Sequence, residues 1–205
     1  MSLNLIARLS VRTKPHVSAP FLRSIRQAPS RLICSSPIAC NKMEDEYKAS
    51  TGPPAQNYTS KSPLILENNV SLPNPTITYN TYGTLNASRS NCVVVCHALT
   101  GNTQLDTWWD SLVGDGRPLD TKKYFVVGVG LIGAVNGETT GPRTINSSTG
   151  RPWGKDFPDV TVRDSVKLQV QLLKEELGVK SVQAVVGGSF GGMQVSGWCN
   201  ERENF

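Results

Sequence analysis

Residues 181–198 read SVQAVVGGSFGGMQVSGW, and they are the most informative part of the sequence. The apolar, β-branched run at 182–186 predicts a buried strand. The pattern G-x-S-x-G follows at 187–191, which is typical of a sharp strand-to-helix turn with a serine at its tip. Side chains at Gly187 or Gly191 would collide across such a turn. We therefore predict that Ser189 is an exposed nucleophile at the positively polarised end of a helix, with the backbone N–H of Phe190 as an oxyanion-hole donor.

Two other kinds of glycine-rich turn do not fit this stretch. A dinucleotide-binding G-x-G-x-x-G loop needs a glycine at the position that Ser189 occupies. A phosphate-binding P-loop needs Gly-Lys-Ser or Gly-Lys-Thr at the start of the helix, and the sequence has neither there. The serine-bearing elbow is the interpretation that fits.

The residues before the elbow alternate between strand and helix patterns. Residues 76–83 predict an antiparallel strand near a sheet edge, and the apolar runs at 91–96 and 124–130 predict buried parallel strands. A short helix is expected around Trp108, Trp109 and Leu112. The long segment 131–158, rich in Gly, Pro, Asn, Ser and Thr, is expected to carry short elements or to line the mouth of a pocket.

Residues 161–177 form the most regular helical pattern of the chain. Thr161 and Asp164 have the spacing of a capping box, and Gly178 supplies the stop. One helix face is apolar, with side chains at Val162, Val166, Val170, Leu173 and Leu177. The element order predicts an α/β fold with a doubly wound, mostly parallel sheet.

A second oxyanion donor is expected after the strand at 91–96. Proteins with this elbow place that donor in the loop after a neighbouring strand, and here the loop begins His97-Ala98-Leu99-Thr100-Gly101. The backbone N–H of Leu99 is our candidate. His97 lies at a strand end ahead of the nucleophile, so we expect it to order the loop by a hydrogen bond rather than to act as the general base.

The basic charge of the chain is confined to its beginning. The 205 residues contain 21 Lys and Arg, seven of which precede residue 44, where no Asp or Glu occurs; 14 basic and 16 acidic residues remain. Arg-rich, Ser-rich and acid-free composition predicts that residues 1–43 are a mitochondrial transit peptide, with a disordered basic tail as the alternative. Residues 44–62, which include Gly-Pro-Pro, are expected to be a linker or arm before a domain at 63–205.

Cysteine usage and hydropathy exclude several classes of protein. Five cysteines are present without metal-ligand spacing, and the two at 92 and 96 lie at opposite ends of one predicted strand, too far apart for a disulfide. No apolar run approaches the ~20 residues of a membrane span. Reduced, buried thiols and no metal cofactor are expected.

Four segments together resemble the homoserine O-acetyltransferase family of α/β-hydrolase-fold enzymes: HALTG at 97–101, GPRTINSSTGRPWGKDFPDVTVRD at 141–164, LLKEELGVKSV at 172–182 and GGSFGGMQ at 187–194. The likeness runs from about residue 60 to 198. PWG at 152–154 and the basic N-terminal segment resemble a fungal, mitochondrial subgroup that acetylates L-serine.

The resemblance implies a ping-pong reaction in the mitochondrial matrix, within cysteine and methionine biosynthesis. Ser189 would take the acetyl group of acetyl-CoA, with the Phe190 and Leu99 N–H groups as the oxyanion hole. The acetyl group would then pass to L-serine, or to L-homoserine as a close second. No cofactor beyond the acyl-CoA substrate is implied, and relatives of this kind form homodimers.

The sequence departs from the family pattern after the elbow. In α/β-hydrolases the triad order is Ser, Asp, His, whereas the two histidines of this chain, His16 and His97, both precede Ser189. We therefore expect an α/β-hydrolase fold truncated after the elbow helix, and an inactive fragment. An esterase or thioesterase of the same fold, and a non-catalytic truncated product, remain the alternatives.

Overall fold

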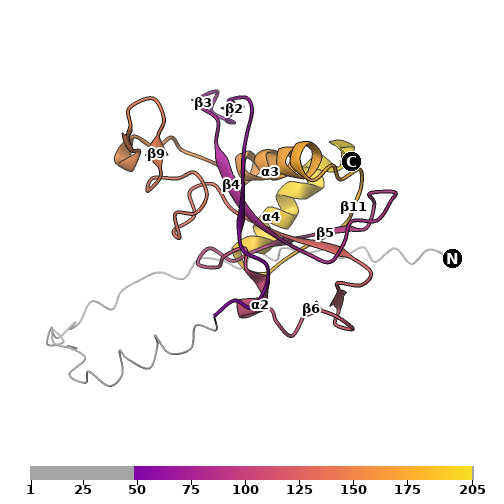
Figure 1. Ribbon diagram of the computed structural model, residues 1–205. Coiled ribbons are helices and arrows are strands. Elements are labelled where there is room, and N and C mark those ends of the chain that lie inside the picture. Colours follow the sequence, from indigo (N-terminus) through magenta and orange to yellow (C-terminus); the bar gives the residue numbers. More distant parts are fainter. Residues whose placement is uncertain (1–48, 205) are drawn as a thin grey trace, which may run out of the picture. The chain divides into compact units, whose positions relative to one another are not determined.

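The computed structural model describes residues 49–204, so the predicted transit peptide lies outside the described residues. A five-stranded mixed sheet with the strand order β1-β4-β8-β5-β11 forms the centre (Figure 1). Its strands are β1 Gln56–Thr59, β4 Thr76–Tyr82, β5 Cys92–Cys96, β8 Phe125–Val129 and β11 Val182–Gly187.

The three strands that lead to the elbow are parallel. β5 pairs with β8 on one side and with β11 on the other, and the apolar runs of β5 and β8 are buried along their whole length. β4 is antiparallel to β8, and β1 is antiparallel to β4. The predicted buried strands at 91–96 and 124–130 and the antiparallel strand near the edge are thus confirmed, within a sheet that is half antiparallel by pairing. The strand predicted at 182–186 is present as β11, but the prediction that it is buried is wrong. Its residues are half-buried or exposed, because β5 pairs with one side of it and no described strand pairs with the other.

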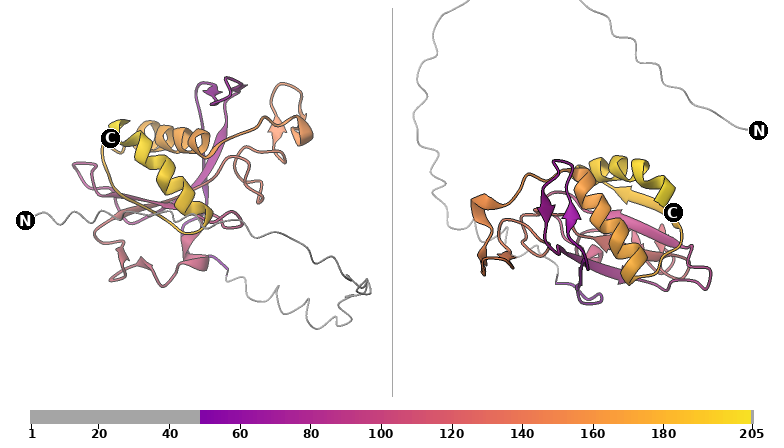
Figure 2. Two further views of the ribbon diagram at one scale, coloured as in Figure 1. Left: turned by 180° about the vertical axis from the view of Figure 1, so that it is seen from behind. Right: turned by 90° about the horizontal axis from the view of Figure 1, so that it is seen from above.

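Helices cover both faces of this sheet, as the alternating order predicted. α3 (Val162–Gln171) and α4 (Phe190–Trp198) pack against one face, where they join the larger apolar core (Figure 2). α2 (Leu105–Trp108) lies on the other face, where Leu105 contacts the buried side chains of Val93 and Val95. α3 continues as a π-helical turn, η2 (Leu172–Glu176), and α4 continues as a 3₁₀ helix, η3 (Cys199–Asn204).

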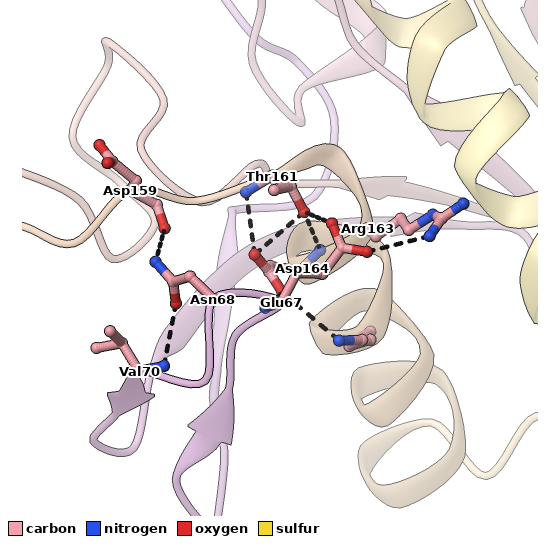
Figure 3. Close-up of polar contacts among 8 residues, drawn as sticks. Glu67, Asn68, Val70, Asp159, Thr161, Arg163 and Asp164 are labelled. Carbon is pink, nitrogen blue, oxygen red and sulfur yellow. Dashed lines mark hydrogen bonds and ion pairs between the residues drawn. The ribbon is translucent and has the colours of Figure 1, made fainter.

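The N-terminus of α3 is fixed by a polar cluster (Figure 3). Thr161 and Asp164 form the predicted capping box, in which each side chain accepts a hydrogen bond from the other residue's backbone N–H. Buried Asp164 also accepts the Glu67 backbone N–H at 2.9 Å, and the Glu67 carboxylate pairs with Arg163 at 3.1 Å. The hydroxyl of Thr161 donates to Glu67 at 2.6 Å. These contacts bind the hairpin that carries Glu67 to the start of α3.

Short strands and one 3₁₀ turn lie in the connections between the main strands. The hairpin consists of β2 (Leu64–Ile65) and β3 (Ser71–Leu72), and a parallel pair follows α2, namely β6 (Val113–Gly114) and β7 (Leu119–Asp120). Segment 131–158 contains the hairpin of β9 (Ile145–Asn146) and β10 (Arg151–Pro152), followed by the 3₁₀ turn η1 (Gly154–Asp156). The expectation that this segment carries elements of its own is therefore confirmed.

One predicted boundary is wrong. Residues 44–62 are predicted to be a linker or arm outside the domain, but Gln56–Thr59 are strand β1 and pair with β4 along their whole length. The side chain of Tyr58 is buried in the main core, and its hydroxyl donates to Glu175 at 2.7 Å. Because this strand contains one apolar residue among polar ones, its sequence has no strand period. Helices long and apolar enough to span a membrane do not occur within residues 49–204.

Candidate active site

Ser189 stands at the tip of a sharp turn between β11 and α4. Its backbone has φ 56° and ψ −125°, a conformation that side-chain-bearing residues adopt at a cost of ~1–3 kcal/mol. The helix begins at the next residue, so Ser189 is its N-cap, and its own side chain makes no capping hydrogen bond. The strand, turn and helix expected of a nucleophile elbow are all present.

Two glycines permit this turn, for the reason that the sequence pattern suggested. A Cβ atom on Gly187 would lie 2.5 Å from the carbonyl oxygen of Gly191, and one on Gly191 would overlap the carbonyl oxygen of Cys96. Both obstacles are backbone atoms, which cannot swing away. Gly188 and Gly192 differ, because a Cβ on either would meet its nearest neighbour at 3.7–3.9 Å.

The two predicted oxyanion donors come from adjacent parallel strands. β11 ends at Gly187, which lies opposite Cys96 at the end of β5. Phe190 is the first residue of α4, so its N–H has no acceptor within the helix. Leu99 follows β5 by three residues, and no described residue accepts a hydrogen bond from its N–H. Because β5 and β11 are parallel neighbours, the loops that follow them begin side by side at the carboxyl ends of the strands. The catalytic roles of Ser189, Phe190 and Leu99 stay predictions.

His97 is buried beneath the loop that carries Leu99. Its side chain is 1% exposed, and its Nδ1 atom lies 2.6 Å from the carbonyl oxygen of Ala98. The Nε2 atom is buried and has no hydrogen-bond partner within residues 49–204. Burial lowers the pKa of His97, because the apolar surroundings disfavour its charged form. These contacts agree with the expected role of ordering the loop.

A buried polar chain, which sequence reasoning missed, links the elbow helix to this loop. Gln194 on α4 donates from Nε2 to the carbonyl oxygen of His97 at 3.2 Å. Gln169 on α3 donates to Gln194 Oε1 and to the Gly130 carbonyl oxygen, each at 2.9 Å, and accepts from Trp198 Nε1 at 2.9 Å. Both glutamines are fully buried. The signal in the sequence was that Gln169 lies on the apolar face of α3, three residues after Val166, and that Gln194 lies within the mostly apolar α4.

Large apolar residues occur in the segments that meet at the elbow. The ring of Trp109 is 3.9 Å from the point where a Cβ on Gly188 would lie. Leu99 and Met193 expose 47% and 59% of their surfaces, although both are large apolar residues. The thiol of Cys96 is buried, and burial raises its pKa to about 12, so it is not a competing nucleophile. No group of three or more His, Cys, Asp or Glu in the described chain could hold a metal ion.

Segment 131–158 lines a cavity, as the sequence suggested, but at some remove from the elbow. A cavity of about 420 Å³ lies between this segment and the starts and ends of the outer strands; its lining includes Thr59, Asn74, Glu138, Thr144 and Trp153. None of its lining residues belongs to the elbow or to 97–101. This cavity is therefore separate from the predicted nucleophile and from the predicted oxyanion loop.

Comparison with known proteins agrees with this geometry. Homoserine O-succinyltransferase of Aromatoleum aromaticum is 50% identical over 146 residues, which cover 66% of this chain and 38% of the relative. The chain is a homologue of the homoserine O-acyltransferases. It also has the fold of the crystal structure of homoserine O-acetyltransferase from Bacillus anthracis, with 33% identity and a TM-score of 0.66 over 71% of this chain and 42% of that one.

Esterase E22 is as similar in structure to this chain as the Bacillus anthracis enzyme is. That match has 33% identity and a TM-score of 0.65, over 69% of this chain and 42% of the esterase. No protein-family model matches the chain. The α/β-hydrolase fold is thus confirmed, and the chain spans about two fifths of the length of the proteins it matches.

Proposed function

We propose that this chain carries the nucleophile and the oxyanion hole of an acetyl-CoA-dependent O-acetyltransferase that acts on a hydroxy amino acid. The observation that supports this most directly is the strained backbone of Ser189. It follows the carboxyl end of β11, next to the carboxyl end of β5, where the Leu99 loop begins. The 50% identical relative, which is named a homoserine O-succinyltransferase, supports the acyltransfer class. L-serine is our favoured acceptor and L-homoserine the second.

The proposed reaction has two half-steps. The Ser189 oxygen attacks the thioester carbon of acetyl-CoA, its proton passes to a general base, and the negative oxygen of the tetrahedral intermediate is bound by the Phe190 and Leu99 N–H groups. The carbon–sulfur bond then breaks, CoA leaves as the thiol and acetyl-Ser189 remains. The hydroxyl of the amino acid attacks that ester, which releases the O-acetyl amino acid and regenerates Ser189.

The general base must come from outside the elbow. His97 is the one histidine among residues 49–204, and its ring is buried and bonded to the Ala98 carbonyl oxygen. The aspartate and histidine of the triad are therefore proposed to be supplied by sequence beyond this chain. As further proposals, the protein acts in the mitochondrial matrix, in cysteine and methionine biosynthesis, and forms a homodimer.

The test uses this chain together with any coding sequence that follows residue 205. Free CoA would be followed after addition of acetyl-CoA with L-serine, with L-homoserine or with neither, and in parallel with succinyl-CoA. We expect release with acetyl-CoA that depends on the acceptor, most strongly on L-serine. Intact mass should show one acetyl adduct on the parent and none on Ser189→Ala, because alanine fits the elbow without the hydroxyl. Equal labelling of both would remove Ser189 from its role.

An esterase is the second candidate, and the structural likeness to esterase E22 favours it. The acetyl-enzyme would then be hydrolysed by water. The same assay separates the two candidates, because an esterase would release CoA, or the alcohol of a simple acetate ester, at a rate that neither L-serine nor L-homoserine changes. Acceptor-dependent release with formation of the O-acetyl amino acid would exclude it.

A further inference from the structure

Two successive carbonyl groups, those of His97 and Ala98, fix the loop after β5 by accepting hydrogen bonds. The His97 carbonyl oxygen accepts a hydrogen bond from Gln194 of α4. The Ala98 carbonyl oxygen lies 2.6 Å from Nδ1 of the His97 ring and accepts the Gly101 N–H at 2.8 Å. Gly101 leaves room for this arrangement, because a Cβ there would lie 3.0 Å from the His97 Cβ. The carbonyl groups of residues 97 and 98 are therefore both fixed.

A trans peptide bond links the orientation of the Ala98 carbonyl group to that of the Leu99 N–H group. The C=O of residue 98 and the N–H of residue 99 belong to one planar unit and point in opposite directions. The described chain contains no cis peptide bond. Because the Ala98 oxygen faces the His97 ring, the Leu99 N–H faces away from it, and no described residue accepts a hydrogen bond from that N–H.

We propose that His97 is a positioning residue whose ring Nδ1–H holds the Ala98 carbonyl, so that the Leu99 N–H is presented to the tetrahedral intermediate on Ser189. This inference deepens the proposed function and rests on it for the oxyanion role of Leu99. It assigns His97 one tautomer, with the proton on Nδ1 and a lone pair on the buried Nε2. The burial of the ring, which disfavours the charged form, agrees with that assignment.

The chain offers closely matched variants for the test. Asparagine places its amide nitrogen where the histidine has Nδ1, so His97→Asn keeps the donor. Glutamine places its amide at the position of Nε2, so His97→Gln keeps a buried polar side chain but moves the donor. Cys92→Ala removes buried volume at the opposite end of β5 without touching the peptide at 98–99, and so controls for general loosening of the strand.

The first measurement is nuclear magnetic resonance on the isotope-labelled 205-residue chain, at a concentration below the onset of the association predicted for it, and it needs no enzymatic activity. Of the two histidine ring signals, the one lost in His97→Asn belongs to His97, and we expect it to show the neutral Nδ1–H tautomer. The Leu99 amide signal should stay in place in His97→Asn and Cys92→Ala, and should shift or split in His97→Gln. A proton on Nε2, or a Leu99 signal unmoved in His97→Gln, would overturn the proposal.

The second measurement is the rate at which an aryl acetate ester acetylates Ser189. It uses the protein of the activity assay, which is this chain together with any coding sequence that follows residue 205. We expect a loss of about 10- to 100-fold in His97→Gln, which is smaller than the roughly 10²–10³-fold loss on removing an oxyanion donor, and rates within about threefold of the parent in His97→Asn and Cys92→Ala. Equal losses in His97→Asn and His97→Gln would overturn the positioning role. If the parent itself is not acetylated, the proposed function fails, while the tautomer and the Leu99 signal still decide how the peptide is held.

Discussion

At the scale of single residues, the site depends on backbone groups more than on side chains. Ser189 contributes a hydroxyl, but both proposed oxyanion donors are amide N–H groups, and about half of the surface of Leu99 is exposed. The residues that hold these amides are buried and polar, as His97 and Gln194 show. Substitutions here are informative only when they separate a side chain from the peptide that carries it.

Leu99→Ala and Leu99→Pro make that separation. Alanine keeps the N–H, so Ser189 acetylation should proceed at close to the parent rate. Proline has no N–H, so acetylation should slow by roughly 10²–10³, the loss seen for one oxyanion donor. Stopped-time intact mass gives both rates, and circular dichroism checks that proline has left the fold intact. An alanine variant as slow as the proline variant would assign the role to the side chain instead.

His97 should make stability depend on pH. Its folded-state pKa lies below the ordinary value of 6.5, so the unfolded chain binds the proton more readily than the folded one. Stability is therefore present above pH 6.5 and is lost as pH falls below it, with a limiting slope of about 1.4 kcal/mol per pH unit for one proton. Urea unfolding at pH 7.5 and 5.5 should show a smaller loss in His97→Asn than in the parent. His16 is present in both and cancels in the comparison.

At the scale of elements, the elbow is a contact between two backbones. α4 begins so close to the end of β5 that a Cβ on Gly191 would overlap the Cys96 carbonyl group, whereas a Cβ on the next residue, Gly192, would meet its nearest neighbour only at an ordinary contact distance of 3.7 Å. The helix is thereby seated at the edge where the parallel strands end. Its one fully buried amide side chain, Gln194, then reaches across to the carbonyl of His97.

Gly191→Ala and Gly192→Ala should therefore have opposite effects on stability. The methyl group at 191 forces α4 away from β5, at a cost of about 1–3 kcal/mol or more. The methyl group at 192 has room and removes a flexible residue from a helix, so the change should be neutral or stabilising by up to ~1 kcal/mol. Urea denaturation of both variants gives the difference. Similar losses at the two positions would contradict the close approach of the backbones.

At the scale of the whole molecule, the described sheet ends in β11, which is paired along one side by β5. Ala184 in this strand is exposed, and beside it Val185, Val195 and Trp198 border a shallow apolar hollow. A free strand edge next to apolar surface is a template for association between molecules. The described chain also offers no free histidine to activate Ser189, because His97 is buried and bonded.

A polypeptide consisting of residues 1–205 alone should associate and should not turn over acetyl-CoA. Loss of triad members costs factors of about 10⁴–10⁶ in comparable enzymes. Light scattering should show association that Ala184→Lys reduces, since a charge at the edge disfavours strand pairing, while Ser148→Lys adds the same charge on an exposed loop without effect. Saturable CoA release that Ser189→Ala abolishes would reveal a base in the chain, with His97 the first to examine.

The N-terminal segment is predicted to act independently of the domain. Its seven basic and no acidic residues before residue 44 predict import into mitochondria. Residues 1–45 fused to a fluorescent protein should locate to mitochondria and lose the segment by cleavage, visible as a mass change. The matched control replaces Arg8, Arg12 and Arg23 by Gln and should remain cytosolic. A diffuse cytosolic signal from the unmodified fusion protein would contradict the prediction.

Much of the fold was predictable because its signals are local. Continuous apolar runs mark strands buried on both faces, as β5 and β8 are, and the spacing of Thr161 and Asp164 marked the start of α3. The elbow was predictable because a strained turn of this shape tolerates few residues, so glycines flank Ser189. Strand β1 was missed because its place depends on pairing with β4 and not on its own pattern.

The sequence alone determined where the central strands and the capped helix form and which serine stands at the turn, because backbone strain, caps and apolar runs restrict the residue type at these positions. Only the tertiary structure decided what supports that serine. Gln169 and Gln194 are 25 positions apart in the chain, and Gln194 and His97 are 97 apart, yet they form one hydrogen-bonded chain. A buried hydrogen bond between distant elements depends on how helices and strands pack, and no local spacing in the sequence records it.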